Sequence, residues 1–284
     1  MIRTRNFTAS DTNWLVQIHN ELYPDKRRTA VSLQRELERA VYARVLTIDD
    51  EIAGYTAVWP VPGLPDIVEI DGFVAPSRQR QGLGSRLLQQ LTADFSDRSP
   101  LQLSWQTNSL ETPGARFLQK HGFSLEHEEW LMELTDWRGL PPAAVPLQTL
   151  DRATAVTQFL RLYDASFSHT PWHQPFTPQE AAADLANAPD LYFLTPEETP
   201  IGFAWVRPSG KGAVEIEPMG IAREWQGRGY GRHLLLAVLQ HLSWQNIHTV
   251  RMGVWAQNTA AVHLYQSVGF RRVASVFYLG MAVG

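Results

Sequence analysis

A glycine-rich turn in the second half of the chain has the spacing that points most directly to a ligand. Residues 226–231 read Gln-Gly-Arg-Gly-Tyr-Gly, between an apolar run at residues 214–221 and a periodic apolar stretch that ends near Leu242. A strand that enters a helix through such a turn leaves the first helical N–H groups unpaired, and the helix dipole adds positive charge there. These groups suit a phosphate, and glycine lets it approach the backbone closely. The spacing matches neither GxxxxGK[ST] nor GxGxxG, and for one lone copy a turn without a ligand is the alternative.

The same turn occurs twice in this chain. Gly82 and Gly84 precede Gly229 and Gly231 by the same interval. A pair of leucines and a Gly-Phe pair repeat at that interval: Leu87 and Leu88 with Leu234 and Leu235, and Gly122 and Phe123 with Gly269 and Phe270. Matched features in the same order indicate a duplicated domain, which decides the domain organisation more than any single segment does.

The elements that carry these residues follow one order in both halves. Each half predicts a strand, two helices, a strand pair, the strand before the glycine turn, a long helix, a fifth strand and a short helix. Residues 130–134 are expected to close the first half, and residues 276–281 the second. The stretch Leu-Pro-Pro-Ala-Ala-Val-Pro at residues 140–146 reads as a linker, so the expected domains are residues 1–139 and 147–284.

Composition limits the classes of protein that this chain can belong to. The 284 residues are 44% hydrophobic and 19% charged with a net charge of −4, which indicates folded domains and gives no reason to expect nucleic acid or an anionic membrane as a partner. The chain has no cysteine, which excludes disulfides, thiolate metal sites and cysteine nucleophiles. The first residues lack the apolar core of a signal peptide, and no run reaches the roughly 18 apolar residues of a membrane span. We therefore expect a cytoplasmic protein.

Each half resembles the GNAT superfamily of acyl-CoA-dependent N-acyltransferases, and the resemblance covers nearly the whole chain. Its marks are a strand, the pattern [QR]-x-x-G-x-[GA], a helix with paired leucines, N-x-x-A-x-x-x-Y and a Gly-Phe pair. The second half contains the complete set: Gln226, Gly229, Gly231, Leu234, Leu235, Asn258, Ala261, Tyr265, Gly269 and Phe270. The resemblance implies an α/β (α+β) fold of two tandem GNAT domains, each with a mixed, mostly antiparallel, splayed central sheet flanked by helices.

The resemblance further implies that acetyl-CoA is the co-substrate, without a metal, and that coenzyme A lies between the fourth and fifth strands. Pro218 supports an irregular strand there, because proline cannot donate to a ladder. An amide of this segment would polarise the thioester carbonyl. The residues assigned to the coenzyme in the second half are Met219, Gly220, Ile221, Gln226, Gly227, Arg228, Gly229, Tyr230, Gly231, Arg232 and Asn258.

Two residues of the second half are candidates for proton transfer. Tyr265 stands where the family places its general acid, and a phenol near a thioester sulfur fits that role. Glu215 stands where some members carry a carboxylate that deprotonates the amine. Glu217, two residues on, would share a sheet face with Glu215. The alternatives are a tyrosine that only packs at the end of its helix and a solvated pair of carboxylates.

The first half matches the family less well. Leu118 stands in place of Tyr265 and cannot give a proton, and Val68 stands in place of Glu215. We expect this half to be catalytically silent, whether or not it still binds coenzyme A. The residues that could hold the coenzyme there are Phe73, Val74, Gln79, Arg80, Gln81, Gly82, Leu83, Gly84 and Ser85.

The acceptor is the least determined part of the prediction. The loop at residues 167–176 could form a wall of the pocket, with Trp172 on one side, or could simply pack onto the domain. His169 and His173 have a spacing that suits a metal on a helix, but Pro171 between them argues against a helix.

The resemblance favours an N-acetyltransferase that acts in its C-terminal domain on a primary amine of a small molecule, as a monomer or homodimer. A thiol-amine acceptor like that of mycothiol synthases, two-copy members of the family, stays open. The alternative class is a non-catalytic module that binds or senses acyl-CoA or serves interactions. A generic nucleotide-phosphate binder is disfavoured, because no Lys-Ser/Thr pair follows the glycines.

Overall fold

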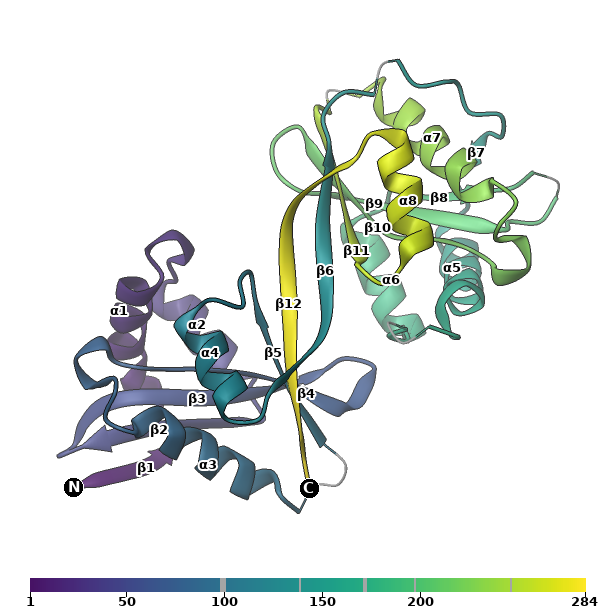
Figure 1. The fold of residues 1–284 in the computed structure, drawn as a ribbon. Coiled ribbons are helices and arrows are strands. Elements are labelled where there is room, and N and C mark those ends of the chain that lie inside the picture. Colours follow the sequence, from purple (N-terminus) through teal and green to yellow (C-terminus); the bar gives the residue numbers. More distant parts are fainter. Residues whose placement is uncertain (98–100, 138, 171–172, 197, 246) are drawn as a thin grey trace. The chain divides into compact units, whose positions relative to one another are not determined.

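The chain folds into two compact units, each built on a mixed sheet with helices on both faces (Figure 1). Unit 1 consists of Met1–Glu126 and Tyr278–Gly284, and unit 2 of His127–Phe277. The structure, a computed structural model, describes residues 1–97, 101–137, 139–170, 173–196, 198–245 and 247–284. The predicted fold class is confirmed.

The sheet of unit 1 runs in the order β1-β2-β3-β4-β5 and ends with the last part of β12. Neighbours from β1 to β4 pair antiparallel, and β4 pairs parallel with β5. The strands are β1 (Ile2–Asn6), β2 (Tyr42–Ile48), β3 (Glu51–Val61), β4 (Leu64–Val74), β5 (Leu101–Thr107) and β12 (Arg271–Val283).

Two pairs of helices cover the sheet of unit 1. Leu15, Leu33 and Leu37 of α1 and α2 pack on one apolar cluster, while Leu91 and Phe95 of α3 pack with α4 on another. Strand side chains alternate between faces, so β3 contributes to both clusters. The helices are η1 (Ala9–Asp11), α1 (Thr12–Leu22), η2 (Pro24–Lys26), α2 (Ala30–Leu37), η3 (Pro76–Arg78), α3 (Leu83–Phe95) and α4 (Pro113–Lys120).

Unit 2 repeats this plan. Its sheet runs in the order β7-β8-β9-β10-β11-β6, with β10 and β11 parallel and the other neighbours antiparallel. The strands are β6 (Ser124–Leu134), β7 (Leu147–Gln148), β8 (Leu191–Leu194), β9 (Gly202–Pro208), β10 (Ala213–Ile221) and β11 (Thr249–Trp255).

Aromatic and aliphatic side chains form the two cores of unit 2. Phe159 of α5 packs with Phe203 and Trp205 of β9 on one face, and the paired Leu234 and Leu235 of α7 are fully buried on the other. The helices are α5 (Arg152–Phe167), α6 (Pro178–Asn187), η4 (Arg223–Trp225), α7 (Tyr230–Leu242) and α8 (Thr259–Val268). Asp151 caps α5, and Thr177 with Glu180 forms a capping box on α6.

The last strand of each unit differs from the sequence prediction. Residues 130–134 belong to β6, which pairs with β11 of unit 2 from Val250↔Leu134 to Trp255↔Glu129. The end of β12 belongs to unit 1, where Leu279 and Val283 join the core. Alternating apolar residues suit either sheet, so the sequence pattern does not specify which one a strand joins. The compact units therefore begin and end at other residues than the predicted boundaries at 139 and 147.

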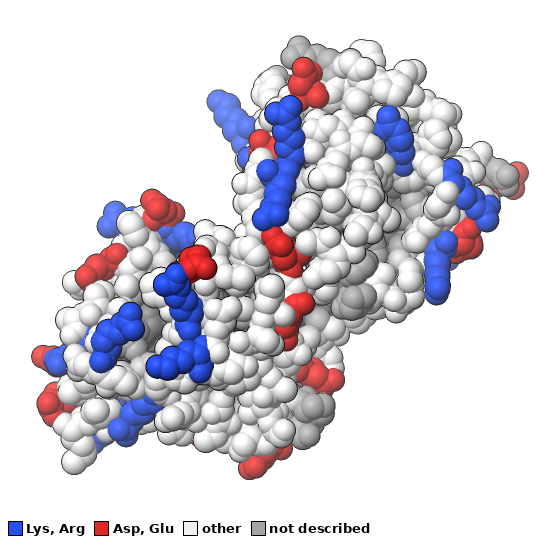
Figure 2. All heavy atoms as spheres, in the orientation of Figure 1, with Lys and Arg blue, Asp and Glu red and all other residues white. Residues whose placement is uncertain are grey.

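Charge is spread rather than concentrated on the face of the molecule drawn in Figure 2. Basic and acidic side chains alternate there among neutral ones, and the described residues on that face form no continuous basic area. Among the described residues, none of the helices is both long and apolar enough to cross a membrane.

Candidate active site

The parallel strands β10 and β11 separate in the middle of unit 2. They pair over only three positions, from Ala213↔Thr249 to Glu215↔Arg251, although both strands continue beyond them. On its other side β10 stays paired with β9, with a shift of register between Ile216 and Met219. The bulge and the separation leave the β11-facing edge of Met219–Ile221 available for an extended ligand, which could pair with it as an added strand.

The glycine turn lies directly after this edge. The side-chain Nε2 of Gln226 donates a hydrogen bond of 2.8 Å to the carbonyl of Ile221 and so ties the turn to the end of β10. Gly227 and Gly229 have φ of 73° and 85°, and Gly229 is the N-cap of α7. Apart from the adjoining chain, no atom of the described residues lies within 4 Å of the position that a Cβ would take at either glycine. The turn therefore presents the start of α7 to open space, as an anion site at a helix N-terminus requires.

Two arginines lie at this helix start. Arg228 places its guanidinium 5.3 Å from the ring centre of Trp225. Nη1 of Arg232 is buried and has no hydrogen-bond partner among the described residues. A buried guanidinium nitrogen without a partner costs free energy unless an acceptor reaches it. The positive φ values, the open space and this nitrogen fit a pyrophosphate, so the residues present suit coenzyme A.

Glu217 lies at the bulge, beyond the last pair of β10 and β11. It is open to solvent on one side, yet protein surrounds it closely enough that burial is the main cause that raises its pKa to about 7. The negative charges of Glu129 and Glu215 raise this pKa further, and Arg207 opposes them. A carboxylate with such a pKa can take a proton at neutral pH.

Tyr265 approaches Glu217 from α8. Its side chain is buried among Val262, Val268 and Phe270, and burial raises the pKa of the phenol well above its usual value. The negative charge of Glu217 is the second cause of that rise, so the two groups lie close enough to interact electrostatically. The gap thus brings a carboxylate and a phenol with raised pKa values together.

Glu215 lies in the part of β10 that is still paired with β11, opposite Arg251. It is therefore before the gap, whereas Glu217 is at it. The sequence could not separate the two, because regular alternation places them on one face and the bulge between Ile216 and Met219 is set by the packing of the strands.

The face of β11 beside Glu217 is bordered by β6. A Cβ at Gly253 would collide with Oε1 of Glu129 and would lie 3.5 Å from Oε2 of Glu217. Next to them, His127 stacks on Trp255 with ring centres 3.8 Å apart, and burial lowers the pKa of His127 to about 4. These β6 residues were missed in the sequence because residues 130–134 were expected in the other half.

The described part of the loop at residues 167–176 packs largely onto α5. Tyr163 contacts the rings of Phe167, His173 and Phe176, with centres 5.0 to 5.6 Å apart, and Nε2 of His173 is 3.0 Å from Oδ1 of Asp164. Trp172, a predicted wall of the acceptor pocket, lies outside the described residues. Among the residues that the structure describes, no three His, Asp or Glu side chains gather as a metal site would require.

Asn258 has a structural role in addition to its predicted contact with the coenzyme. It is the N-cap of α8, and its Oδ1 accepts a hydrogen bond of 3.2 Å from the amide of Ala261. This bond orients the helix that carries Tyr265. The contact of Asn258 with coenzyme A stays a prediction.

Unit 1 has a related turn on a more regular strand. Nε2 of Gln79 donates to the carbonyl of Val74 at 3.0 Å, as Gln226 does to Ile221. Gly82 has φ of 78°, but Arg80 takes a positive φ of 61° where unit 2 has Gly227. The pairing of β4 with β3 continues without a shift over residues 68–74, so the bulge of β10 has no counterpart there. Leu118 is buried in the core of unit 1.

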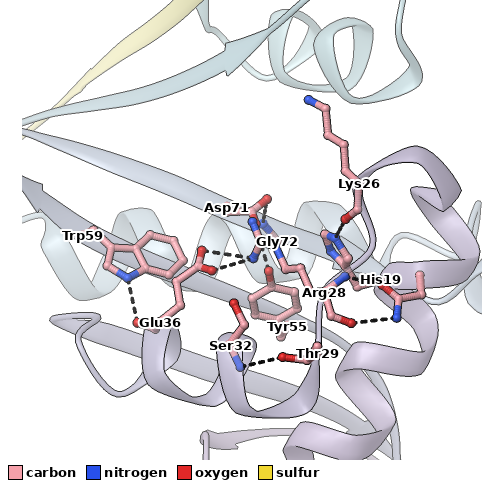
Figure 3. A network of polar contacts seen from close by, with 11 residues as sticks. His19, Lys26, Arg28, Thr29, Ser32, Glu36, Tyr55, Trp59, Asp71 and Gly72 are labelled. Carbon is pink, nitrogen blue, oxygen red and sulfur yellow. Dashed lines mark hydrogen bonds and ion pairs between the residues drawn. The ribbon is translucent and has the colours of Figure 1, made fainter. Parts of the chain in front are cut away.

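The side of β4 that corresponds to the Glu217 side of β10 is occupied by a polar network (Figure 3). Arg28 pairs with Glu36 at 3.0 Å, and the hydroxyl of Tyr55 donates to Oδ2 of Asp71 at 2.9 Å. Asn20 holds the backbone of Arg28 through two hydrogen bonds. A cation of the chain itself therefore lies among the carboxylates of this unit.

The chain belongs to the acetyltransferase (GNAT) family, whose model matches residues 11–123 and 156–270. Both halves are thus family copies, as the repeat predicted, and the family supports acyltransferase activity.

Relatives with a curated name include mycothiol acetyltransferases. That of Arthrobacter sp. (strain FB24) is 32% identical, and the match covers 78% of this chain and 72% of the relative. That of Paenarthrobacter aurescens (strain TC1) is 30% identical over 83% of this chain and 79% of the relative. Among solved structures, a tandem GNAT protein from the clavulanic acid biosynthesis pathway has a TM-score of 0.62 and 16% identity, covering 100% of this chain and 99% of that one. A GCN5-related N-acetyltransferase from Sphaerobacter thermophilus has a TM-score of 0.69 and 18% identity, covering 99% and 95%.

Proposed function

We propose that unit 2 transfers the acetyl group of acetyl-CoA to a primary amine of a small molecule. The observation that carries this proposal is the convergence of Glu217 and Tyr265 at the gap between β10 and β11. The glycine turn that follows β10 adds an anion site at the start of α7. A proton acceptor, a proton donor and a phosphate site around one gap suit transfer from an acyl-CoA to an amine.

The coenzyme would be held by backbone more than by side chains. The free edge of Met219–Ile221 would pair with the pantetheine arm, and the amides at the start of α7, with Arg228 and Arg232, would hold the pyrophosphate. When bound, acetyl-CoA supplies a thioester carbonyl that an amine can attack. An amide of the β10 edge would stabilise the charge that develops on its oxygen.

Glu217 is proposed as the base in place of Glu215. An amine enters at neutral pH as an ammonium ion and must lose a proton before its lone pair can attack. Glu217, with a pKa of about 7, retains a proton more readily than an ordinary carboxylate and lies at the gap. Glu215 lies before the gap, opposite Arg251.

Tyr265 is proposed as the acid that protonates the leaving sulfur. The raised pKa keeps its phenol protonated in the resting site. Once Glu217 accepts a proton, its negative charge disappears, and one cause of the raised pKa of Tyr265 disappears with it. Proton transfer from the amine to Glu217 thus makes the phenol of Tyr265 a more ready proton donor. Overall the nitrogen loses two protons, of which one passes through Glu217 to solvent and the other replaces the proton that Tyr265 gives to sulfur.

The class of acceptor is a primary amine, and the relatives named mycothiol acetyltransferase make a thiol-amine the first compound to test. At an identity of about 30%, the acceptor of these relatives is a candidate for this chain that has to be tested directly. Unit 1 is proposed to be catalytically silent, because Leu118 replaces the acid and Arg28 with Glu36 lies where an amine would have to approach.

The test is release of free coenzyme A from acetyl-CoA with a panel of amines. We expect turnover by the wild type, a loss of about 100-fold in kcat for Glu217→Gln, and a much smaller effect for the neighbouring Glu215→Gln. Coenzyme A should bind both variants. Binding of acetyl-CoA without release with any amine would instead favour the non-catalytic module. A large loss in Glu215→Gln with a functional Glu217→Gln would restore Glu215 as the base.

A further inference from the structure

We propose that Glu129 of β6 is a positioning residue for acetyl transfer: with Glu217 it holds the ammonium group of the acceptor beside Gly253, and its negative charge keeps Glu217 ready to accept the proton. This inference rests on the proposed function and goes beyond the family pattern, because β6 precedes the linker and the whole second repeat in the chain.

The geometry places the two carboxylates on one side of β11. A Cβ at Gly253 would meet Oε1 of Glu129 and would lie 3.5 Å from Oε2 of Glu217. Both carboxylates therefore lie close to the same point on the backbone of β11. A side chain at this position would displace the carboxylate of Glu129 from the place where it lies. Strand pairing supports this placement, because Glu129 lies opposite Trp255, whose side chain points to the same face as position 253.

Several charged or titratable groups face Glu217, and among them Glu129 has the largest effect on the pKa of Glu217. Arg207 of β9 lowers the pKa of Glu217. Its guanidinium is shared with other acceptors, because Nη2 pairs with Asp184 of α6 at 3.2 Å and Nε donates to the backbone carbonyl of Glu217. Next to burial, the charge of Glu129 is the largest cause that raises the pKa of Glu217. The groups, by element, are Glu129 on β6, Arg207 on β9, Glu215 on β10, Tyr163 on α5 and Tyr265 on α8.

Two carboxylates at short range favour a single positive charge between them. An ammonium group between Glu129 and Glu217 would relieve their repulsion, and a proton then passes from its nitrogen to Glu217. The neutral nitrogen forms the bond to the acetyl carbon, the carbon–sulfur bond breaks, and the sulfur takes the proton of Tyr265, which the second proton of the nitrogen replaces. The acceptor class is therefore an amine that arrives as a cation, in preference to a hydroxyl or to an ammonium group with a carboxylate close by, as in an amino acid.

The kinetic test compares Glu129→Gln with Glu128→Gln across pH. Glu128 is the next residue on β6, and it pairs with Arg272 and Ser275 at 2.8 Å, so its variant controls for loss of a charge and of contacts on the same strand. We expect Glu129→Gln to move the acid limb of kcat/KM to lower pH by about one unit, since loss of a negative neighbour lowers the pKa of Glu217. The KM for the amine should rise about tenfold while the KM for acetyl-CoA stays constant. Glu129→Asp should restore part of both effects, and Glu128→Gln should keep the wild-type limb.

If the acid limb of kcat/KM lies at the same pH in Glu129→Gln and in the wild type, the inference about Glu129 is overturned and the proposed function stands. A direct titration of Glu217 tests the inference about Glu129 separately from the proposed function. In the full chain labelled with 13C at the glutamate carboxyls, the signal absent from Glu217→Gln identifies Glu217, and Glu129→Gln should shift its titration to lower pH. A shifted titration in a chain that releases no coenzyme A with any amine would overturn the proposed function and the role of Glu129 in it.

Discussion

The carboxylate of Glu217 lies close enough to the phenol of Tyr265, at the gap between β10 and β11, for its negative charge to hinder ionisation of the phenol. Glu217 belongs to the bulged strand and Tyr265 to the helix that follows β11, and the negative charge of Glu217 raises the pKa of the phenol. The relationship exists because β10 and β11 stop pairing after Glu215 and Arg251. It connects the two proton transfers that the proposed reaction needs.

Tyr265→Phe should lower kcat by about 100-fold, the scale of a lost general acid. The ring and its packing against Phe270 are retained, so the fold and the KM for acetyl-CoA should stay as in the wild type. The measurement is steady-state release of coenzyme A with thermal unfolding as the control for folding. Full turnover in Tyr265→Phe would remove the phenol from the mechanism and leave a packing role.

The ionisation of Glu217 should make the protein less stable as the pH rises. Its pKa is raised in the folded chain from 4.5 to about 7, so the folded state binds this proton more tightly than the unfolded state does. The contribution to stability is complete below pH 4.5 and is lost as the pH rises through 7. Glu217→Gln has no such proton, and its free energy of unfolding should fall less over this range.

Urea unfolding of both proteins at intervals between pH 4.5 and 8 measures this difference. Groups that do not interact with Glu217 titrate equally in the two chains and cancel in the comparison. Parallel curves would mean that Glu217 has an ordinary pKa in the folded protein.

The two glycine turns offer a matched pair of variants. Gly229 and Gly82 are the N-caps of α7 and α3 with φ of 85° and 78°, and at both the position of a Cβ is open among the described residues outside the adjoining chain. Alanine at either should cost roughly 1 kcal/mol of stability through its left-handed backbone. Only Gly229→Ala should lower kcat/KM for acetyl-CoA, by tenfold or more, because the added methyl group meets the phosphates in the working unit.

Kinetics and thermal unfolding of Gly229→Ala and Gly82→Ala check this expectation together. Equal losses of stability with unequal losses of activity are expected. A loss of activity confined to Gly82→Ala would place the reaction in unit 1.

A fragment of residues 127–277 should fold better than one of residues 147–284. The shorter fragment lacks the buried Met132 and Leu134 of β6 and, after the strand, Trp137, whose Nε1 donates to the carbonyl of Leu239 at 3.0 Å. Loss of these side chains removes roughly 4 kcal/mol or more, since one buried Met or Leu contributes about 2 to 5 kcal/mol. Circular dichroism and urea unfolding of the two fragments provide the measurement, and equal cooperative transitions would contradict the placement of β6 in unit 2.

The repeat and the motif residues predicted most of the fold. The interval between Gly82 and Gly229 identified two copies, and a helix follows each turn, as expected, beginning at Leu83 and at Tyr230. These features are local, because a turn that needs a positive φ and a helix with a periodic apolar face are written in adjacent residues. The roles predicted for Tyr265, Glu215 and the coenzyme-binding residues stay predictions.

The sequence did not predict which sheet β6 and β12 join, or which of the two glutamates lies at the gap. The apolar alternation of β6 and β12 satisfies either sheet, so only the packing of the whole chain assigns Leu134 to unit 2 and Leu279 to unit 1. Likewise, alternation makes Glu215 and Glu217 equivalent until the bulge separates them.

By itself, then, the sequence determined the duplicated family fold, the two glycine turns and the absence of cysteine chemistry, because each depends on residue type and spacing along the chain. The tertiary structure alone decided that Glu217 lies at the gap with Tyr265, and that Glu129 reaches it from β6. Those neighbours come from strands and helices far apart in sequence, and the ionisation of a carboxylate depends on the burial and charge that such neighbours create.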